Sequence, residues 1–132
     1  MKKLLLTFTI LFSTLMISTP SYGEWTEGSE NKSGDTFYVD FERIRKHDGY
    51  VYYWKLADFL KPLVGGYLSM KMYYQGDCKV FRQKSLSGSF HKEPMGGGTG
   101  ENLPIPETHK GWKYPPPTSA DEVVLKQVCS KQ

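Results

Sequence analysis

The sequence predicts an α+β fold: a single small domain in which an antiparallel β-sheet of five or six strands carries one C-terminal helix packed on it and is closed by one disulfide. Three observations predict this fold. Apolar and aromatic residues alternate with polar ones in several stretches, turn-forming residues separate the stretches, and a helix-capping pattern precedes a final apolar stripe. The length of 132 residues suits one domain.

Three stretches are predicted as strands because apolar residues recur at every second position. They are Thr36–Phe41, Tyr50–Leu60 and Tyr67–Tyr74. The faces expected to be buried carry Phe37, Val39 and Phe41; Tyr50, Tyr52, Trp54, Leu56 and Leu60; and Leu68, Met70, Met72 and Tyr74. Tyr53 and Lys55, like Lys71 and Tyr73, are therefore expected outside the core.

Two turns are predicted between these strands. Asp48-Gly49 is typical of a two-residue type I′ hairpin, since glycine adopts a positive φ without steric cost. Gln75–Asp77 is expected to turn the chain into a further strand near Cys78–Leu86. Apolar and polar residues alternate poorly in that strand, which favours an edge strand, a bulged strand or a strand with both faces partly exposed to solvent.

The character of the chain changes from Ser87 to Pro117. Glycines at 96–98 and 100 and prolines at 104, 106 and 115–117 argue against regular structure over most of this span. A helix is predicted after it, because Ser119 and Glu122 form a capping box. The stripe on the helix that would face the sheet comprises Val124, Leu125, Val128 and Cys129.

The first 23 residues are predicted to be a cleaved signal peptide, with residues 24–132 as the domain. Lys2 and Lys3 precede the uncharged stretch Leu4–Ile17, and Ser21 and Gly23 have the spacing of a signal-peptidase site. As a helix, the 14 residues Leu4–Ile17 would rise about 21 Å, which is too short to cross a hydrocarbon core of roughly 30 Å. The alternative is that this segment stays uncleaved as a membrane anchor. If it is cleaved, no membrane span is expected in the remaining chain.

The predicted export indicates the redox state of the two cysteines. Cys78 and Cys129 are an even pair in an oxidising compartment, which favours a disulfide between them. No cysteine precedes Cys78, so the lipid-attachment cysteine of a lipoprotein is missing. Loss of Lys2 and Lys3 with the leader brings the net charge of +3 close to zero, which argues against nucleic acid as a partner.

No catalytic residue, cofactor or metal site is predicted. The glycine cluster at 96–100 lacks the lysine and hydroxyl residue of a phosphate-binding loop, and its expected role is close backbone packing. His47, His91 and His109 show no ligand spacing and are expected at the surface. The alternative is a small periplasmic enzyme or ligand carrier with a pocket lined by acids such as Asp58, Glu93 and Glu107.

The candidate binding residues are Lys110, Trp112 and Tyr114, where aromatic and basic side chains alternate in the long loop. Interfaces are enriched in such aromatic residues. The competing interpretation is that Trp112 and Tyr114 anchor the loop onto the sheet.

Several segments resemble the surface-adhesin protein E-like family of small exported bacterial proteins. The resemblance runs from Trp25 to Cys129. The segments that carry it, in chain order, are Thr36–Asp40, Arg43–Lys46, Asp48–Val51, Val51–Asp58 with Trp54, Gly76–Lys79, Glu93–Gly100, Trp112–Tyr114, Pro115–Pro117 and the helix ending at Cys129.

The resemblance implies a compact antiparallel sheet backed by one helix, with a disulfide matching Cys78 and Cys129. It also implies a non-enzymatic binding protein, since the named adhesin of the family is a cell-surface protein that binds host matrix and serum proteins. We therefore expect a bacterial protein in the periplasm, at the cell surface or secreted. It would recognise a protein or envelope partner through a sheet face or the 88–114 loop. Self-assembly into an envelope structure is a further possibility.

Overall fold

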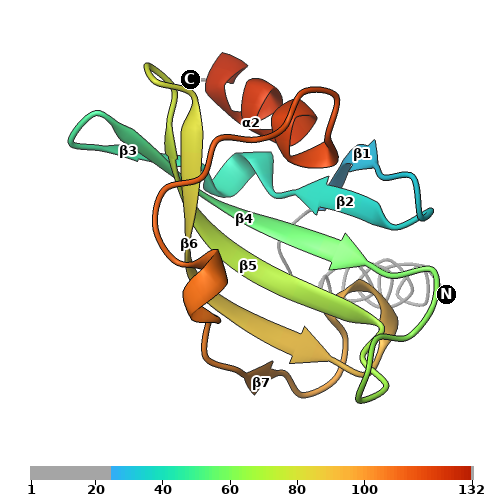
Figure 1. The fold of residues 1–132 in the computed structure, drawn as a ribbon. Coiled ribbons are helices and arrows are strands. Elements are labelled where there is room, and N and C mark those ends of the chain that lie inside the picture. Colours follow the sequence, from blue (N-terminus) through green and yellow to red (C-terminus); the bar gives the residue numbers. More distant parts are fainter. Residues whose placement is uncertain (1–24, 132) are drawn as a thin grey trace, which may run out of the picture.

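The computed structural model describes residues 25–131, and the predicted leader at 1–23 lies outside the described residues. A seven-stranded antiparallel sheet forms the body of the domain (Figure 1). Its elements are β1 (Thr26–Glu30), β2 (Thr36–Val39), η2 (Phe41–Arg43), β3 (Arg45–His47), β4 (Tyr50–Asp58), β5 (Ser69–Asp77), β6 (Arg82–His91), η3 (Pro94–Gly96), β7 (Glu101–Asn102), η4 (Glu107–His109) and α2 (Ala120–Ser130). The predicted α+β fold class is confirmed.

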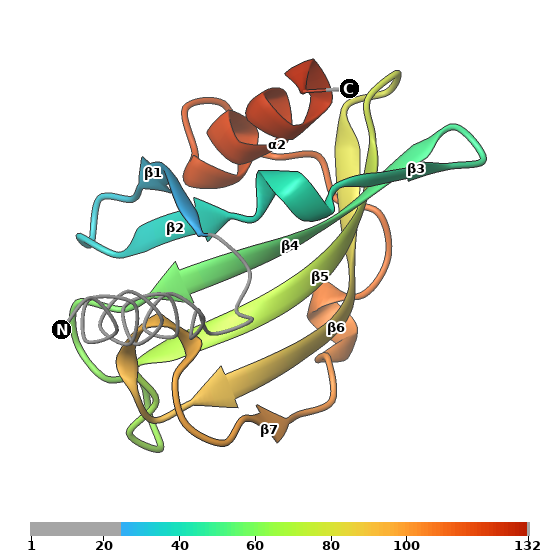
Figure 2. The same ribbon diagram turned by 180° about the vertical axis from the view of Figure 1, so that it is seen from behind.

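The strand order is β1-β2-β4-β5-β6-β7, and β3 pairs with the first half of β4 beyond the end of β2. Helix α2 and the segment 103–119 lie on one side of the sheet, here called the helix face (Figure 1). The opposite side, here called the open face, carries the turn around η3 at one end of the sheet (Figure 2). The two faces are described separately below, because each carries a different candidate site.

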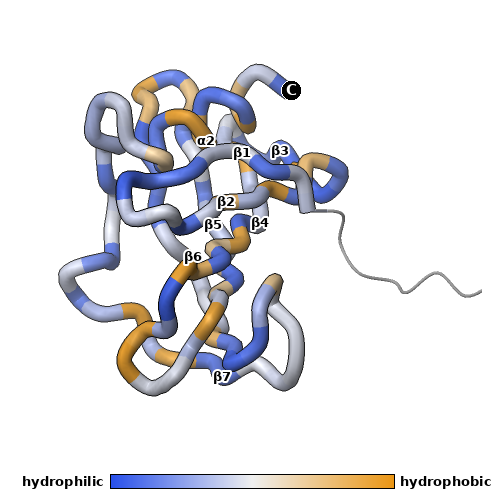
Figure 3. The backbone as a smooth tube through the Cα atoms, turned by 90° about the vertical axis from the view of Figure 1, so that its right-hand side faces the viewer, coloured by the Kyte–Doolittle hydropathy of each residue, from blue (hydrophilic) through white to orange (hydrophobic). Residues whose placement is uncertain are grey.

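The core lies between the sheet and α2. From the sheet it takes Val39, Val51, Tyr53 and Tyr74, and from the helix Val124, Leu125 and Val128, all of which are buried. Each fully buried aliphatic side chain contributes about 1.5–3 kcal/mol. In Figure 3 the colouring alternates between hydrophobic and hydrophilic through the sheet, as expected where each strand turns alternate side chains to opposite faces.

The predicted disulfide and helix are confirmed. Cys78, in the turn after β5, is bonded to Cys129 near the end of α2, with Cα atoms 5.7 Å apart. Ser119 caps the helix by accepting a hydrogen bond from the backbone N–H of Glu122 at 3.1 Å. The Glu122 carboxylate does not return to the Ser119 amide; it accepts from the Thr118 amide at 3.2 Å, so the capping box is displaced by one residue.

The hairpin at Asp48-Gly49 is also confirmed, with φ values of 51° and 82° that match a type I′ turn. The second predicted turn is wrong. Gln75–Asp77 continue β5, and the chain turns at 78–81. The Asp77 carboxylate stabilises that turn by accepting the amides of Lys79 and Val80, each at 3.2 Å. The expected strand at Cys78–Leu86 therefore starts only at Arg82 and extends to His91, with a bulge opposite Tyr73 and Tyr74.

The assignment of faces along β4 is reversed, although Leu56, expected to be buried, is buried on the open face next to Gly96. Tyr53 and Lys55, expected outside the core, are 0% and 2% exposed and face α2. Tyr52 and Trp54, expected inside, are only half-buried on the open face. The Lys55 ammonium is accommodated because its Nζ lies 2.5 Å from Asp121 Oδ1 and 4.4 Å from the centroid of the Tyr74 ring.

The glycine-rich turn packs closely on the open face, as predicted. Gly96 is buried with a φ of 70°, and a Cβ atom there would lie 2.5 Å from Lys71 Cε. His91, expected at the surface, is 4% exposed. Its ring nitrogens lie 2.9 Å from Ser89 Oγ and 3.1 Å from the Gly97 carbonyl oxygen, so His91 holds this turn against the sheet.

Candidate binding face

Aromatic and basic side chains gather on the half of the open face that the η3 turn leaves uncovered. We define the aromatic–basic patch as Arg43, Arg45, Tyr52, Trp54 and Tyr73. The rings of Trp54 and Tyr73 are 4.8 Å apart between centroids, and those of Tyr52 and Tyr73 are 6.2 Å apart. Arg45 Nη2 donates to the Tyr73 hydroxyl at 3.4 Å. The result is a row of rings bordered by guanidinium groups.

The sheet register positions this patch. Trp54 lies directly opposite Tyr73 in the β4–β5 pairing, and Arg45 lies opposite Tyr52 in the β3–β4 pairing. Residues opposite one another in an antiparallel pair project to the same face, so the side chains meet without any loop rearrangement. Arg43 is held from η2, where its Nε lies 3.7 Å from the buried carboxylate of Asp40.

Two hollows adjoin the patch. The larger, about 600 Å³, lies between Trp25, Arg43, Trp54, Lys71 and the turn at 94–98. The second, about 500 Å³, is lined by Glu42, Arg43, Arg45, Trp54 and Tyr73. Both are open depressions of the surface, and Trp54 and Arg43 line both. The patch therefore combines large rings, cations and recesses, which are features of protein-binding surfaces.

Trp112 reaches this face from the long loop. Its ring centroid is 5.5 Å from that of Tyr50, and Arg82 Cζ and Lys84 Nζ lie 4.3 Å and 5.0 Å from it. Tyr50 shares the side of β4 that carries Tyr52 and Trp54. Trp112 thereby extends the row of aromatic and basic groups toward the turn at 78–81.

The other two predicted binding residues are placed differently. Lys110 pairs with Glu107 in its own loop, with Nζ 2.8 Å from Oε1, and Tyr114 is 64% exposed. Between Trp112 and Tyr114, the backbone of Lys113 forms a bridge with Gln83, with hydrogen bonds of 2.9 Å and 2.8 Å. Anchoring of the loop onto the sheet is thus observed at this point, whereas binding by Lys110, Trp112 and Tyr114 stays a prediction.

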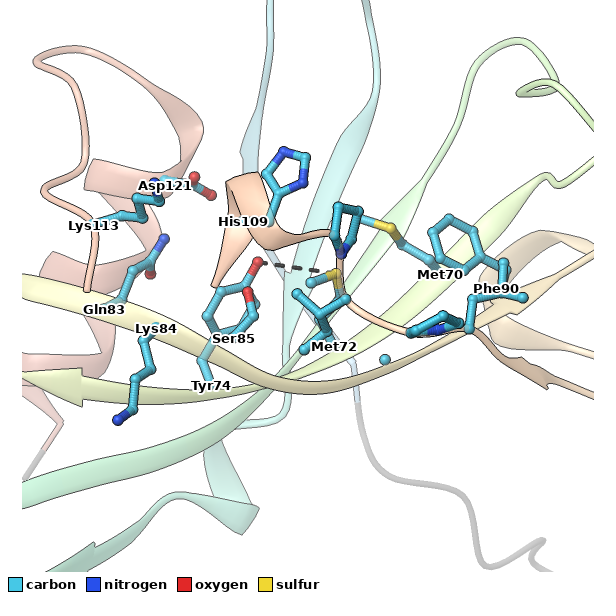
Figure 4. Close-up of a pocket in the computed structure, with 15 residues that line it drawn as sticks. Met70, Met72, Tyr74, Gln83, Lys84, Ser85, Phe90, His109, Lys113 and Asp121 are labelled. Carbon is cyan, nitrogen blue, oxygen red and sulfur yellow. Dashed lines mark hydrogen bonds between the residues drawn. The ribbon is translucent and has the colours of Figure 1, made fainter. Parts of the chain in front are cut away.

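A separate cavity lies on the helix face, between the sheet and the proline-containing loop (Figure 4). It has a volume of about 300 Å³. Gln83, which lines this cavity, accepts a hydrogen bond at its Oε1 from the Tyr53 hydroxyl at 2.7 Å. Burial raises the pKa of Tyr53 well above its usual range. Burial alone would lower the pKa of Lys55, but Tyr74 and Asp121 raise it by more, so this pKa lies above its ordinary value.

The acids of the enzyme alternative do not converge. Asp58 accepts the Met95 amide at 2.8 Å beside the turn that contains Glu93, on the open face. Glu107 lies in η4 on the helix face and pairs with Lys110 (Figure 1). Within residues 25–131 no group of three or more His, Cys, Asp or Glu side chains is placed to hold a metal ion.

The sequence pattern does not predict the patch, because it predicts Tyr52 and Trp54 on the buried face of their strand. A signal for it was present: Arg45 begins β3 opposite Tyr52, and Arg43 lies two residues before it at the end of η2. Arginine at alternate positions beside a strand rich in tyrosine and tryptophan is typical of an exposed contact face.

The fold defines a small domain built on one antiparallel sheet, with the aromatic–basic patch exposed on its open face. A family model described as Surface-adhesin protein E matches residues 25–130, and the chain belongs to this family.

Two solved structures of Haemophilus influenzae protein E have the same fold. One, from crystal form II, aligns with a TM-score of 0.62 at 15% identity and covers 86% of this chain and 96% of that chain. The other aligns with a TM-score of 0.63 at 16% identity and covers 86% of this chain and 89% of that chain. The search of curated proteins gave no match. In the described residues, no helix has both the length and the apolar character needed to cross a bilayer.

Proposed function

We propose that this chain is an exported, non-enzymatic binding protein that recognises a protein or envelope partner through the aromatic–basic patch. The observation that carries the proposal is the row formed by Tyr52, Trp54 and Tyr73 on an uncovered sheet face, bordered by Arg43 and Arg45. Membership of the Surface-adhesin protein E family supports binding as the type of function.

The charges of the patch favour an acidic surface on the partner. Arg45 and Lys84 have no ion-pair partner in the part of the chain that the structure describes, and Arg43 is 60% exposed despite its contact with Asp40. Arginine beside tyrosine and tryptophan forms bidentate and stacking contacts, which give both affinity and orientation. Rings that are already packed against each other lose little side-chain entropy on binding.

A non-enzymatic role is part of the proposal, since the candidate acids already serve the fold. Asp58 holds the η3 turn and Glu107 pairs with Lys110. The proposed location is the periplasm or the cell surface, in keeping with the predicted leader and the description of the family.

Crosslinking in intact cells, followed by purification of the exported protein, tests the proposal. We expect a partner captured with the wild type to be lost with Arg45→Glu and Tyr73→Ala. Lys61→Glu, an equal charge change on the exposed loop between β4 and β5, is the matched control and should retain it. Retention of the partner by both patch variants would refute this face as the binding site.

The contribution of the loop is tested in the same experiment. Trp112→Ala removes the ring stacked under Arg82, and Lys110→Ala removes an exposed cation that pairs only within its own loop. Loss of the partner with Trp112→Ala extends the binding face to the loop. If neither change weakens capture, the assignment of Lys110, Trp112 and Tyr114 to binding is wrong, while the patch itself is judged by Arg45→Glu. Sedimentation at two concentrations distinguishes a second copy of the chain from another partner.

A further inference from the structure

We propose that the helix-face cavity binds a medium-chain carboxylate, a molecule with a linear apolar tail and a carboxylate head. This site lies on the opposite side of the sheet from the aromatic–basic patch and does not depend on the function proposed for the patch. The assignment rests on the lining of the cavity, its volume, and one buried amide with an unused donor.

One end of the cavity is apolar. Met70, Met72 and Phe90 form its floor on β5 and β6 (Figure 4), and Leu103 and Ile105 face them from the loop. Gly88 lies opposite Met72 in the pairing, and its missing side chain leaves the space open. Two methionines give this end a flexible lining that adapts to a linear tail.

The other end is polar, with Gln83, Lys113 and Asp121 drawn together in Figure 4. Gln83 is 4% exposed; its Oε1 accepts the Tyr53 hydroxyl, and its amide nitrogen makes no hydrogen bond to the described residues. Because Gln83 lines the cavity, this unused amide donor is available to an acceptor oxygen of a ligand. Gln83 thus marks the position of the head group.

The charge at the polar end favours a carboxylate over an uncharged or cationic head. Asp121 is already paired with Lys55, whose Nζ lies 2.5 Å from Oδ1. Lys113 lines the same cavity and has no ion-pair partner among residues 25–131, and its backbone is fixed to Gln83, so its ammonium group is available to a ligand at this end. A carboxylate oxygen accepts a charge-assisted hydrogen bond from such a group.

The volume sets the length of the tail. A cavity of about 150 Å³ accommodates benzene, which has six carbon atoms. The present cavity, at about 300 Å³, therefore accommodates about twelve non-hydrogen atoms, the number in decanoate. It also reaches the lower end of the roughly 300–1,000 Å³ typical of ligand sites.

Methionine methyl NMR with decanoate as the probe tests the proposal. After Gly23, the chain has three methionines: Met70 and Met72 line the cavity, and Met95 lies in the η3 turn of the open face. We expect saturable shifts of the Met70 and Met72 methyl signals below the micelle concentration of the probe, with Met95 unchanged. Octanoate should bind about tenfold more weakly, since it lacks two methylene groups.

Two pairs of variants separate the site from general surface binding. Gly88→Val fills the cavity, whereas Gly88→Ala adds only a Cβ atom, 3.8 Å from Met72 Cγ and without positive φ, and keeps most of the space. We expect decanoate binding to be lost in the valine variant and retained in the alanine variant. Lys113→Gln should weaken binding about tenfold, and Lys110→Gln should leave it unchanged.

Four results would overturn the proposal. Absence of Met70 and Met72 shifts at millimolar decanoate would exclude the site, and equal shifts of all three methionines would indicate surface adsorption. Binding in folded Gly88→Val equal to that of the wild type would place the ligand elsewhere. Equal affinity for decyltrimethylammonium, which has the opposite head charge, would disprove the role of Lys113. Amide spectra of each variant confirm that it is folded.

Discussion

The two faces of this sheet are built from similar residues and do different things. On the helix face Tyr53 and Tyr74 stack with centroids 5.5 Å apart beneath α2, and both are buried. On the open face the Trp54 and Tyr73 rings pack at a tilt in the same strand pairing, with centroids 4.8 Å apart, yet both remain half-buried. Aromatic content therefore does not identify the core here. What distinguishes the faces is which of them the helix and the loop cover.

Coverage depends on a small number of attachments. The disulfide fixes the end of α2 at the turn after β5, and Lys55 fixes its start by pairing with Asp121. Between these points the helix contributes a short apolar stripe. Among residues 25–131, no comparable element covers the aromatic–basic patch on the open face, which leaves its rings available to a partner. The difference between the faces can be tested by weakening each attachment in turn.

The largest effect is expected from removal of the disulfide. Cys78→Ser with Cys129→Ser opens a link between residues 51 positions apart, and the chain-entropy relation gives a loss of about 4 kcal/mol in the free energy of unfolding. Urea denaturation of the double variant, and of the wild type with reductant, measures this loss. An unchanged midpoint would show that the helix is held by packing alone. The patch variant Tyr73→Ala serves as the comparison and should lose clearly less.

Next in size is truncation of the helix stripe. Leu125 is fully buried against the sheet, so Leu125→Ala removes apolar contacts and leaves a cavity, at a cost of about 3 kcal/mol. The control is Leu86→Ala, because Leu86 is 38% exposed at the bulge of β6 and should change stability by less than about 1 kcal/mol. Thermal and urea unfolding of the pair measure the difference. Similar losses at both positions would contradict the assigned core.

Local signals in the sequence were sufficient for the fold class. Asp48-Gly49 predicted its hairpin and Ser119 its helix, because each acts through its own backbone geometry. The turn after β5 was placed three residues early, since the determining interaction is the Asp77 side chain accepting amides further along the chain. Polar β1 was not predicted: it has no alternation, and it is held by pairing with β2 and by Gln127 Nε2 donating to the Gly28 carbonyl at 3.0 Å.

The candidate site was less predictable from the sequence than the fold class, because it depends on which face of β4 is buried. Both faces of β4 carry large side chains, so alternation identified a strand but not its inner face. Tyr50, Tyr52, Trp54, Leu56 and Leu60 predict the inner face, and Lys55 falls on the other one, in keeping with how seldom a lysine is buried. Its burial depends on Asp121, which is 66 positions away, and on the ring of Tyr74. Long-range partners of this kind have no signal in the local sequence.

A smaller effect is expected from Lys55→Met, which tests why this lysine is buried. Loss of the ammonium leaves Asp121 unpaired, but Asp121 is 41% exposed and is solvated by water, so the expected loss is about 1–2 kcal/mol at pH 7. The pKa of Lys55 is raised in the folded state, so its contribution is fully present below about pH 10.4 and is lost as the pH rises through the folded pKa. The variant should therefore approach the wild type in stability above that pH.

Unfolding by urea at pH 7 and pH 11 measures both parts of this prediction. Lys71→Met is the matched change on the open face, where the side chain pairs with no carboxylate within residues 25–131, and it should alter neither value appreciably. A gap between Lys55→Met and the wild type that stays constant across this range would show that packing of the stem, rather than the charge, makes the contribution.

The smallest effect concerns the turn that joins β5 to β6, where the two faces meet at the disulfide. Burial would raise the pKa of Asp77, but hydrogen bonds from Val80 and Lys79 and the contact of Arg82 Nε, at 3.1 Å, hold it below its ordinary value. A lowered pKa stabilises the fold above about pH 3.9, and this contribution is lost as the pH falls through the folded value. Asp77→Asn should thus lower the melting temperature at pH 6 and flatten its decline between pH 4 and pH 2. Asp48→Asn, a change at the exposed hairpin, is the control. A decline as steep in Asp77→Asn as in the wild type would assign acid sensitivity to another carboxylate.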